Sequence, residues 1–272
     1  MTAAVSSTMS KIDVVLSDLA FPESPRCRDG RVYVSDWGAG EVHALVSGGS
    51  EVVARGSAFP MCIDFLPDGR LVVVHGRELL VQETDGVFAT YADLAHLSEH
   101  GFNDVTVTKD GFVYVGNVDF EFPGGEPRPG FIAVVTPDGR AERVAGGVMF
   151  PNGLAVIGDE LVVAESYGSR LTAFPIGADG SLGEGRTWAD LGEGVPDGIC
   201  VDPAGRIWYA DVPHESCTLV AEGGELVRTI GLDRGAFSCA LDGDTLYVAT
   251  NLWTGGPTPG RNGQLVAVDL SS

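Results

Sequence analysis

The stretch Val195-Pro196-Asp197-Gly198-Ile199 runs directly into Cys-Val-Asp-Pro-Ala-Gly-Arg-Ile-Trp-Tyr-Ala-Asp, which ends at Asp211. An acidic residue stands between Pro and Gly, and an apolar run, a tight turn and a second apolar run follow it. Because a short turn between two such runs is typical of a β-hairpin, this stretch predicts two antiparallel strands. It also provides a pattern for comparison with the rest of the chain.

Five other segments follow the same pattern, so the chain contains six copies of one unit. The residues that enter the first strand of each copy are Glu23, Cys62, Asn103, Asn152, Asp197 and Ser238. They stand about 40 to 50 residues apart, which is the usual length of a four-stranded propeller blade. Each copy also has room for two further strands after its hairpin. The sequence therefore predicts an all-β fold, a six-bladed β-propeller with four-stranded blades.

The two chain ends are expected to close the ring. In the predicted closure, Ile12–Leu16 forms the outer strand of the blade that ends with Gln264–Asp269, so that no sheet edge stays open at the seam. The whole chain, 1–272, then forms a single propeller domain, with residues 1–11 as a flexible tail. Two long Gly- and Pro-rich insertions, Val118–Gly130 and Leu252–Gly263, are expected to lie over one mouth of the ring, because long loops often carry function.

Composition limits the function classes. The net charge is −21 and the pI is about 4.4, which disfavours nucleic acid and anionic membranes as partners and favours cations. The same acidity also serves solubility. The chain begins without a signal-peptide pattern, contains no long apolar run, and carries five cysteines without a CxxC motif. These features predict a cytoplasmic protein with reduced thiols, and the default expectation is a monomer.

Oxygen donors stand at four of the six matched positions, namely Glu23, Asn103, Asn152 and Asp197. The first strand of each propeller blade lines the central channel, so these side chains are expected to converge although they are far apart in sequence. Carboxylate and amide oxygens suit Ca²⁺, Mg²⁺ or Mn²⁺, and are merely tolerable for Zn²⁺. The alternative is that Asn and Asp serve here as turn formers that cap nearby backbone groups.

Four short motifs give the chain a resemblance to a known family. They are Pro22-Glu23-Ser24-Pro25, Phe102-Asn103-Asp104, Phe150-Pro151-Asn152-Gly153 and Pro196-Asp197-Gly198. With them the chain resembles the senescence-marker-protein/gluconolactonase/luciferin-regenerating-enzyme family, also called regucalcin-like. The resemblance extends from about Val14 to Asp269.

The resemblance implies a six-bladed propeller that hydrolyses lactones with one divalent cation in its channel. By motif match, Glu23, Asn152 and Asp197 would bind the metal, with Ca²⁺ the first expectation and Mg²⁺, Mn²⁺ or Zn²⁺ the others. Asp197 would also be the general base on water, and Asn103 would contact the small-molecule lactone or ester.

One position departs from the family pattern. Gly101 stands where family members that act on sugar lactones commonly have an Arg. Five aromatic residues could instead give an apolar mouth, which favours a less polar lactone or ester: Phe102, Phe120, Phe122, Tyr167 and Trp253.

Two further residues are candidates for substrate contact, together with Tyr167 and Trp253. Glu121 falls in the loop where the family often has a substrate-binding residue, although an exposed loop carboxylate is the alternative. His75 ends the second strand of its blade and could move protons near the mouth, although a structural histidine is the alternative.

Two non-hydrolytic interpretations stay open. In one, the propeller binds a ligand or protein and the cation is structural. In the other, the chain is an enzyme of secondary metabolism with the same fold, such as a condensing enzyme resembling strictosidine synthase. The set Glu23, Asn152 and Asp197 discriminates among them, because neither alternative needs three converging oxygen ligands.

Overall fold

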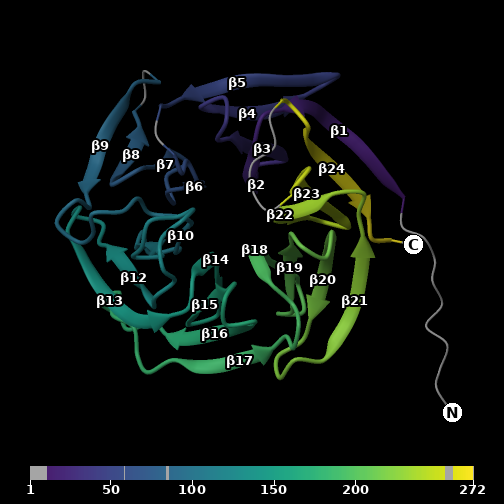
Figure 1. Cartoon of the computed structure of the whole chain (residues 1–272). Coiled ribbons are helices and arrows are strands. Elements are labelled where there is room, and N and C mark those ends of the chain that lie inside the picture. The colour runs from purple at the N-terminus through teal and green to yellow at the C-terminus, as the bar shows by residue number, and fades with distance from the viewer. Residues whose placement is uncertain (1–10, 58, 84–85, 255–259, 272) are drawn as a thin grey trace, which may run out of the picture.

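The computed structural model describes residues 11–57, 59–83, 86–254 and 260–271. Within these ranges the regular elements are 24 β-strands and no helix. The strands form six four-stranded antiparallel sheets arranged like blades around a central axis (Figure 1). The predicted six-bladed β-propeller is therefore confirmed. The proposed tail falls almost entirely on residues outside the described ranges, and the single-domain assignment stays a prediction.

Each blade runs from an innermost strand at the axis to an outermost strand at the rim. Blade 1 contains, in that order, β2 (Pro22–Arg28), β3 (Arg31–Asp36), β4 (Glu41–Val46) and β5 (Gly49–Arg55), and blade 2 contains β6 (Ile63–Phe65), β7 (Leu71–His75), β8 (Glu78–Gln82) and β9 (Phe88–Asp93). Blade 3 contains β10 (Val105–Val107), β11 (Val113–Asn117), β12 (Gly130–Val135) and β13 (Ala141–Val148), and blade 4 contains β14 (Pro151–Ile157), β15 (Glu160–Glu165), β16 (Arg170–Pro175) and β17 (Arg186–Asp190). Blade 5 contains β18 (Pro196–Val201), β19 (Ile207–Asp211), β20 (Ser216–Val220) and β21 (Leu226–Gly231), and blade 6 contains β22 (Gly235–Asp242), β23 (Thr245–Asn251), β24 (Gly263–Asp269) and β1 (Ile12–Leu19).

The ring closes through blade 6, which joins both ends of the chain. β1 pairs antiparallel with β24, and Ile12 stands opposite Val268 at the start of this pairing. Figure 1 shows the N-terminal strand in purple along the outside of the yellow C-terminal strands. The predicted closure is confirmed, and it supplies blade 6 with its fourth strand.

The hydrophobic core lies between the sheets. Alternating apolar residues of neighbouring blades pack into separate clusters, of which the largest joins blades 2 and 3 and includes Val74, Phe102 and Phe131. Another joins blades 4 and 5 around Trp188 and Tyr209. Because both faces of a blade are covered in this way, the middle strands are buried along their length, as in β12 and β19.

A polar residue ends the second strand of every blade and holds the backbone that leads into an inner strand. Asp36 accepts hydrogen bonds from Ala20 N and Phe21 N. Glu165 accepts one from Met149 N at 2.6 Å. The six residues at this position are Asp36, His75, Asn117, Glu165, Asp211 and Asn251. These contacts hold the segments that lead into the inner strands of blades 1 to 5, with Asn251 of blade 6 bonding Ala20 before β2, and the candidate site is built from the beginnings of those strands.

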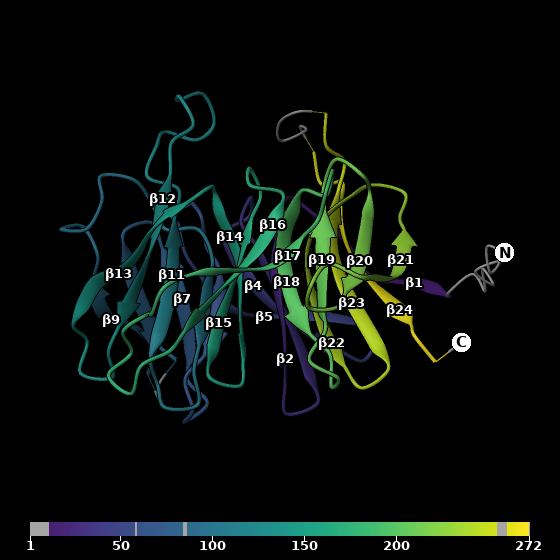
Figure 2. The same ribbon diagram turned by 90° about the horizontal axis from the view of Figure 1, so that it is seen from below.

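The two predicted loops lie on one face of the ring. The loop that joins β11 to β12 and the loop that joins β23 to β24 both connect a second strand to a third, and Figure 2 shows both rising on the same side of the blades. This is also the face on which the inner strands begin. The expectation for these insertions is confirmed for their described residues.

Candidate active site

The inner strands carry bulges where they enter the channel. Between Pro151 and Leu154, two residues of β14 stand opposite one residue of β15, and the same irregularity occurs in β2 and in β18. A bulge inserts an extra residue and turns its side chain out of the regular alternation. Asn152 and Asp197 lie within the bulges of β14 and β18, and Glu23 is the last paired residue before the bulge of β2. The bulges therefore place one oxygen donor from each of three blades at the channel mouth.

The glycines of the Asn-Gly and Asp-Gly motifs allow the inner strands to approach closely. A Cβ atom on Gly153 would lie 2.6 Å from the carbonyl oxygen of Asp197 and from the backbone nitrogen of Ile199. A Cβ atom on Gly198 would lie 2.1 Å from the Ser238 hydroxyl. No real Cβ atom makes such contacts, so glycine is needed at both positions for the donors of blades 4, 5 and 6 to converge.

Gly153→Ala is expected to destabilise the protein by about 2 kcal/mol or more, because the added methyl group meets backbone atoms that cannot rotate away. Chemical denaturation measures this change. Gly146→Ala is the matched control, because a Cβ atom there meets nothing within 4 Å. Equal stability of the two variants would contradict the assigned role of Gly153.

Hydrogen bonds connect the amide side chains of two blades. Asn103 Nδ2 donates to Asn152 Oδ1 at 2.9 Å. Asn152 Nδ2 donates to Ser166 Oγ at 3.2 Å, and the neighbouring Asn152 side chain acts to lower the pKa of Asp197. Ser166 in turn donates to Pro196 O at 2.7 Å. Asn103, Asn152 and Asp197 therefore form one connected group across blades 3, 4 and 5.

Glu23 faces this group from blade 1. Its Oε2 atom accepts a hydrogen bond of 2.6 Å from Ser24 N, and the side chain is buried. Ser24 has a φ of 50°, in the left-handed region that non-glycine residues rarely adopt. Its hydroxyl exchanges hydrogen bonds with Ile63 N and Ile63 O of the neighbouring blade. These contacts hold the backbone beside Glu23 against β6 of blade 2.

The carboxyl groups perturb one another. Burial raises the pKa of Glu23 to about 8, and Asp104 contributes to the shift. Burial also raises the pKa of Asp197 well above its ordinary value, with further contributions from Glu23 and Asp104. The cause is physical: ionised carboxyls lose hydration when buried and repel one another at short range. A strongly perturbed acidic pair in a channel is typical of a functional site.

A second layer of charge lies next to this pair, and the sequence did not reveal it. Arg26 donates to Asp104 at 3.3 Å and to Val105 O at 2.8 Å, and its Nε lies 3.9 Å from Asp64. Burial acts to lower the pKa of Arg26, but Asp104 and Asp64 together raise it. Arg26 therefore neutralises part of the second layer, while Glu23 and Asp197 have no cation of comparable proximity in the described contacts.

The donor set fits a hard divalent cation. Two buried carboxyls with raised pKa values and the Asn152 amide oxygen supply oxygen ligands only, which Ca²⁺ and Mg²⁺ prefer. A cation would also offset the repulsion between the carboxyls. No group of three or more His, Cys, Asp or Glu side chains in the described residues is placed to hold a metal. The predicted set contains just two residues of these types, since its third member is an amide.

The remaining predicted contacts lie around this centre. Tyr167 is largely exposed at the rim, with its ring 4.6 Å from that of Phe150. Trp253 packs 5.6 Å from Phe237. Glu121 is exposed in the loop before β12. The roles of Tyr167, Trp253 and Glu121 in substrate binding stay predictions.

His75 has a backbone partner. Its Nε2 atom accepts a hydrogen bond of 3.3 Å from Ser57 N, as the carboxylates of Asp36, Glu165 and Asp211 accept backbone N–H groups in their blades. This arrangement favours the structural alternative, and a role in substrate binding stays a prediction.

The expectation that Phe102 contributes to an apolar mouth is wrong. Its side chain is fully buried in the core between blades 2 and 3, where its ring lies 5.9 Å from that of Phe131. The physical reason is that Phe102 stands on the opposite side of the backbone from Asn103. The space that a side chain of residue 101 would occupy is also not empty, because a Cβ atom on Gly101 would lie 3.2 Å from Pro60 Cδ.

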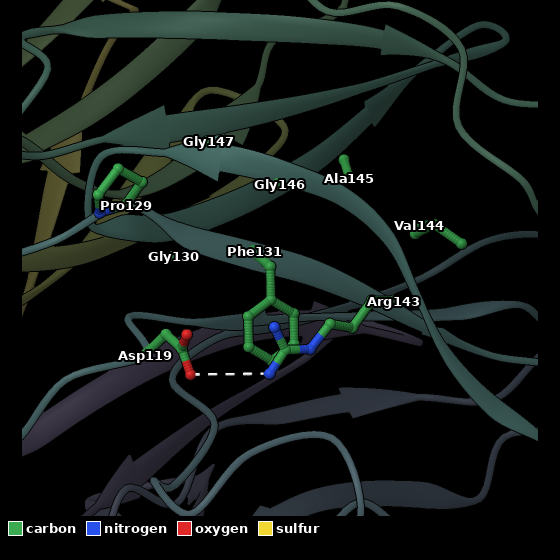
Figure 3. A pocket seen from close by; sticks show the side chains of 9 residues that line it. All are labelled: Asp119, Pro129, Gly130, Phe131, Arg143, Val144, Ala145, Gly146 and Gly147. Carbon is green, nitrogen blue, oxygen red and sulfur yellow. Dashed lines mark ion pairs between the residues drawn. The ribbon is translucent and has the colours of Figure 1, made fainter.

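A pocket of about 440 Å³ lies at the outer side of blade 3, along β12 and β13. Figure 3 shows Asp119 facing Arg143 across it, at 3.7 Å. Arg143 also lies 3.7 Å over the Phe131 ring and donates to Leu97 O. None of the predicted site residues lines this pocket, so it is separate from the channel.

The blades and their channel donors define a six-bladed β-propeller with a candidate divalent-metal centre at one mouth. The model of the SMP-30/gluconolactonase/LRE-like region matches residues 21–251. Because this match covers most of the chain, the chain belongs to that family, and the resemblance drawn from the four motifs is confirmed.

Individual relatives are distant. A pentonolactonase of Haloferax volcanii is 27% identical over 222 residues, which cover 72% of this chain and 68% of that protein. A diisopropyl-fluorophosphatase of Loligo vulgaris is 30% identical over 155 residues, or 49% of this chain and 48% of that protein. A luciferin-regenerating enzyme structure has a TM-score of 0.82 at 20% identity, with 96% of this chain and 95% of that chain covered. This last likeness concerns the fold alone.

Proposed function

We propose that this chain is a divalent-metal-dependent hydrolase that opens a lactone or a related cyclic ester. The observation that carries the proposal is the convergence of Glu23, Asn152 and Asp197 from three bulged inner strands, with two buried carboxyls whose pKa values are raised. The matched family and the relatives named as a pentonolactonase and a fluorophosphatase support a hydrolase. The proposed protein is a cytoplasmic monomer. The described residues contain no apolar helix of membrane-spanning length.

In this proposal Glu23, Asn152 and Asp197 hold one divalent cation, Ca²⁺ by first preference, and Mg²⁺, Mn²⁺ or Zn²⁺ otherwise. When bound, the cation supplies a Lewis acid for the lactone carbonyl. Asn103, which hydrogen-bonds Asn152, is placed to orient the substrate beside the ligand set. The amide pair keeps the Asn103 side chain at a fixed angle, which favours a reactive orientation.

Asp197 takes the proton of the attacking water at one of its carboxylate oxygens. With the cation bound, Asp197 is a weak base because the positive charge lowers its proton affinity, and this suffices because strained lactones are already reactive. The neighbouring Asn152 side chain favours the charged carboxylate, since it acts to lower the pKa of Asp197. The ring opens when the alkoxide leaving group receives a proton, which the protonated Asp197 returns.

A hydrolysis screen by proton release tests this function. Chelator-stripped protein is offered sugar, aliphatic and aryl lactones, with Ca²⁺, Mg²⁺, Mn²⁺ or Zn²⁺ added back singly. Turnover that depends on one added metal is the expected result. Thermal stabilisation by a metal without turnover of any lactone would instead favour a binding propeller with a structural cation or a non-hydrolytic enzyme.

A further inference from the structure

Two clusters of aromatic side chains lie on the face where the inner strands begin. The first, which we call the wide cluster, contains Phe21, Trp37, Phe59, Phe237 and Trp253, with neighbouring ring centroids 4.9 to 6.4 Å apart. The second, which we call the narrow cluster, contains Phe120, Phe122, Phe150 and Tyr167, with centroids 4.6 to 6.4 Å apart. Such distances are those of packed aromatic pairs.

Both clusters are joined to the candidate site through the backbone. Phe21 stands two residues before Glu23, and Phe150 stands two residues before Asn152. Phe237 is the third residue of the inner strand β22, and the other members either precede an inner strand or follow the end of a second strand, so that all lie toward the same mouth. The wide cluster comes from blades 6 and 1 and the approach to blade 2, whereas the narrow cluster comes from blades 3 and 4. They therefore flank the oxygen donors from opposite sides of the ring.

Each cluster contains both buried and exposed aromatic side chains. Phe237 and Phe150 are buried, whereas Phe59, Tyr167 and Phe122 are 56%, 47% and 45% exposed. Exposed aromatic side chains that gather next to a site of polar donors are unusual on a protein surface, and they typically mark a binding surface. The apolar rim thus continues directly into the polar centre.

Gly101, two residues before Asn103, lies against the Phe59–Pro60 segment of the wide cluster. The backbone oxygen of Phe59 and the Pro60 ring pack against the position that a side chain of residue 101 would occupy. The position where sugar-lactone members of the family carry a cation is therefore bordered here by the Phe59–Pro60 segment and by the backbone oxygen of Gly76. The chain also carries a net charge of −21, which disfavours an anionic substituent on the substrate and favours release of a carboxylate product.

We propose that the preferred substrates are lactones that carry an alkyl or aryl substituent, with the ring at the oxygen donors and the apolar substituent between the two aromatic clusters. This inference rests on the proposed lactone hydrolysis for its reaction, but the apolar subsite can be measured without turnover. Each methylene group that leaves water for the aromatic surface strengthens binding by up to about fourfold.

The turnover test compares kcat/KM for γ-butyrolactone, γ-nonalactone and glucono-1,5-lactone with the activating metal present. γ-Nonalactone is expected to exceed γ-butyrolactone by about tenfold or more, since its pentyl chain adds five carbons of apolar surface. Phe59→Ala and Tyr167→Ala are each expected to reduce this ratio severalfold. Leu226→Ala is the matched control, because Leu226 is an exposed apolar residue on β21, the outer strand of blade 5. Preference for the sugar lactone, or a ratio near one, would overturn the inference and leave the hydrolase intact.

A binding test separates the inference from the function. The lactam 5-pentyl-2-pyrrolidinone resists hydrolysis, and calorimetry compares its affinity with that of 2-pyrrolidinone. A pentyl advantage of about tenfold that falls in the Phe59→Ala and Tyr167→Ala variants supports the apolar subsite, even in a protein that hydrolyses no lactone. Equal affinity of the two lactams would reject it, whatever the turnover result.

Discussion

Asp197→Ala is expected to lower lactone turnover by roughly 10³-fold or more, because it removes both the general base and one of the proposed metal ligands. Metal affinity is expected to fall in parallel. The fold is expected to persist, since Asp197 is buried beside Glu23 and Asp104, and its charge destabilises the metal-free state through repulsion. Turnover, calorimetric metal binding and thermal unfolding of the same preparation measure the three effects.

Asp202→Asn is the matched control for this experiment. Asp202 is a buried carboxylate of the same blade, but it accepts hydrogen bonds from Ala204 N and Arg206 N in the turn between β18 and β19, at the far end of the inner strand. Its replacement is expected to lower stability without lowering kcat. If Asp197→Ala retained full lactonase activity, Asp197 would not be the base, and a similar loss in both variants would indicate a general effect on folding.

The fold was predictable because a propeller repeats its signals. The turn at Asp202–Gly205 has counterparts in the other blades, and six weak hairpin signals at a constant spacing determine one architecture. The closure of the ring was predictable for a related reason, since Ile12–Leu16 was the apolar run left over at one end of the chain, and a propeller with an open blade would expose a sheet edge.

The three proposed metal ligands were predictable because they stand at matched positions of the repeated unit. Glu23, Asn152 and Asp197 occupy matched positions, so the ring geometry alone brings them together. Arg26 and Asp64 gave no such signal, because Arg26 stands three residues after the first donor of its blade and Asp64 two residues after Cys62. Whether side chains at unmatched positions meet depends on how deep in the channel each one lies and on the bulges of the inner strands. Neither the depth nor the bulges follow from the sequence pattern.

Phe102 illustrates a different limit. Aromatic residues near a motif are equally compatible with the mouth and with the core, and the side of the strand decides between them. Phe102 and Asn103 precede the paired residues of β10, so the alternation of that strand gives no certain direction for them. Phe120 and Phe150 differ from Phe102 because their rings contact the exposed Tyr167. These contacts depend on how the loops fold.

The metal-free protein is expected to lose stability as the pH rises from about 5 to about 8.5. Glu23 has its pKa raised from 4.5 to about 8 in the folded state, and Asp197 is raised as well, so the folded protein binds more protons than the unfolded chain throughout this range. Linkage then makes the free energy of unfolding fall with rising pH, from the unfolded pKa up through the folded one. For Glu23 alone the loss is on the order of 4 kcal/mol, at about 1.4 kcal/mol per unit of pKa.

Denaturation of chelator-stripped protein across this pH range measures the slope, and saturating metal and Glu23→Gln supply the comparisons. A bound cation keeps both carboxyls ionised and releases their protons, so it is expected to raise stability most at the upper end of the range and to remove the fall. Glu23→Gln cannot ionise, and it is expected to be more stable than the wild type at pH 8.5 without metal and about equal to it at pH 5. A metal-free wild type whose stability stays constant or rises between pH 5 and 8.5 would contradict the buried acidic pair, and with it the basis for a cation at this mouth of the propeller.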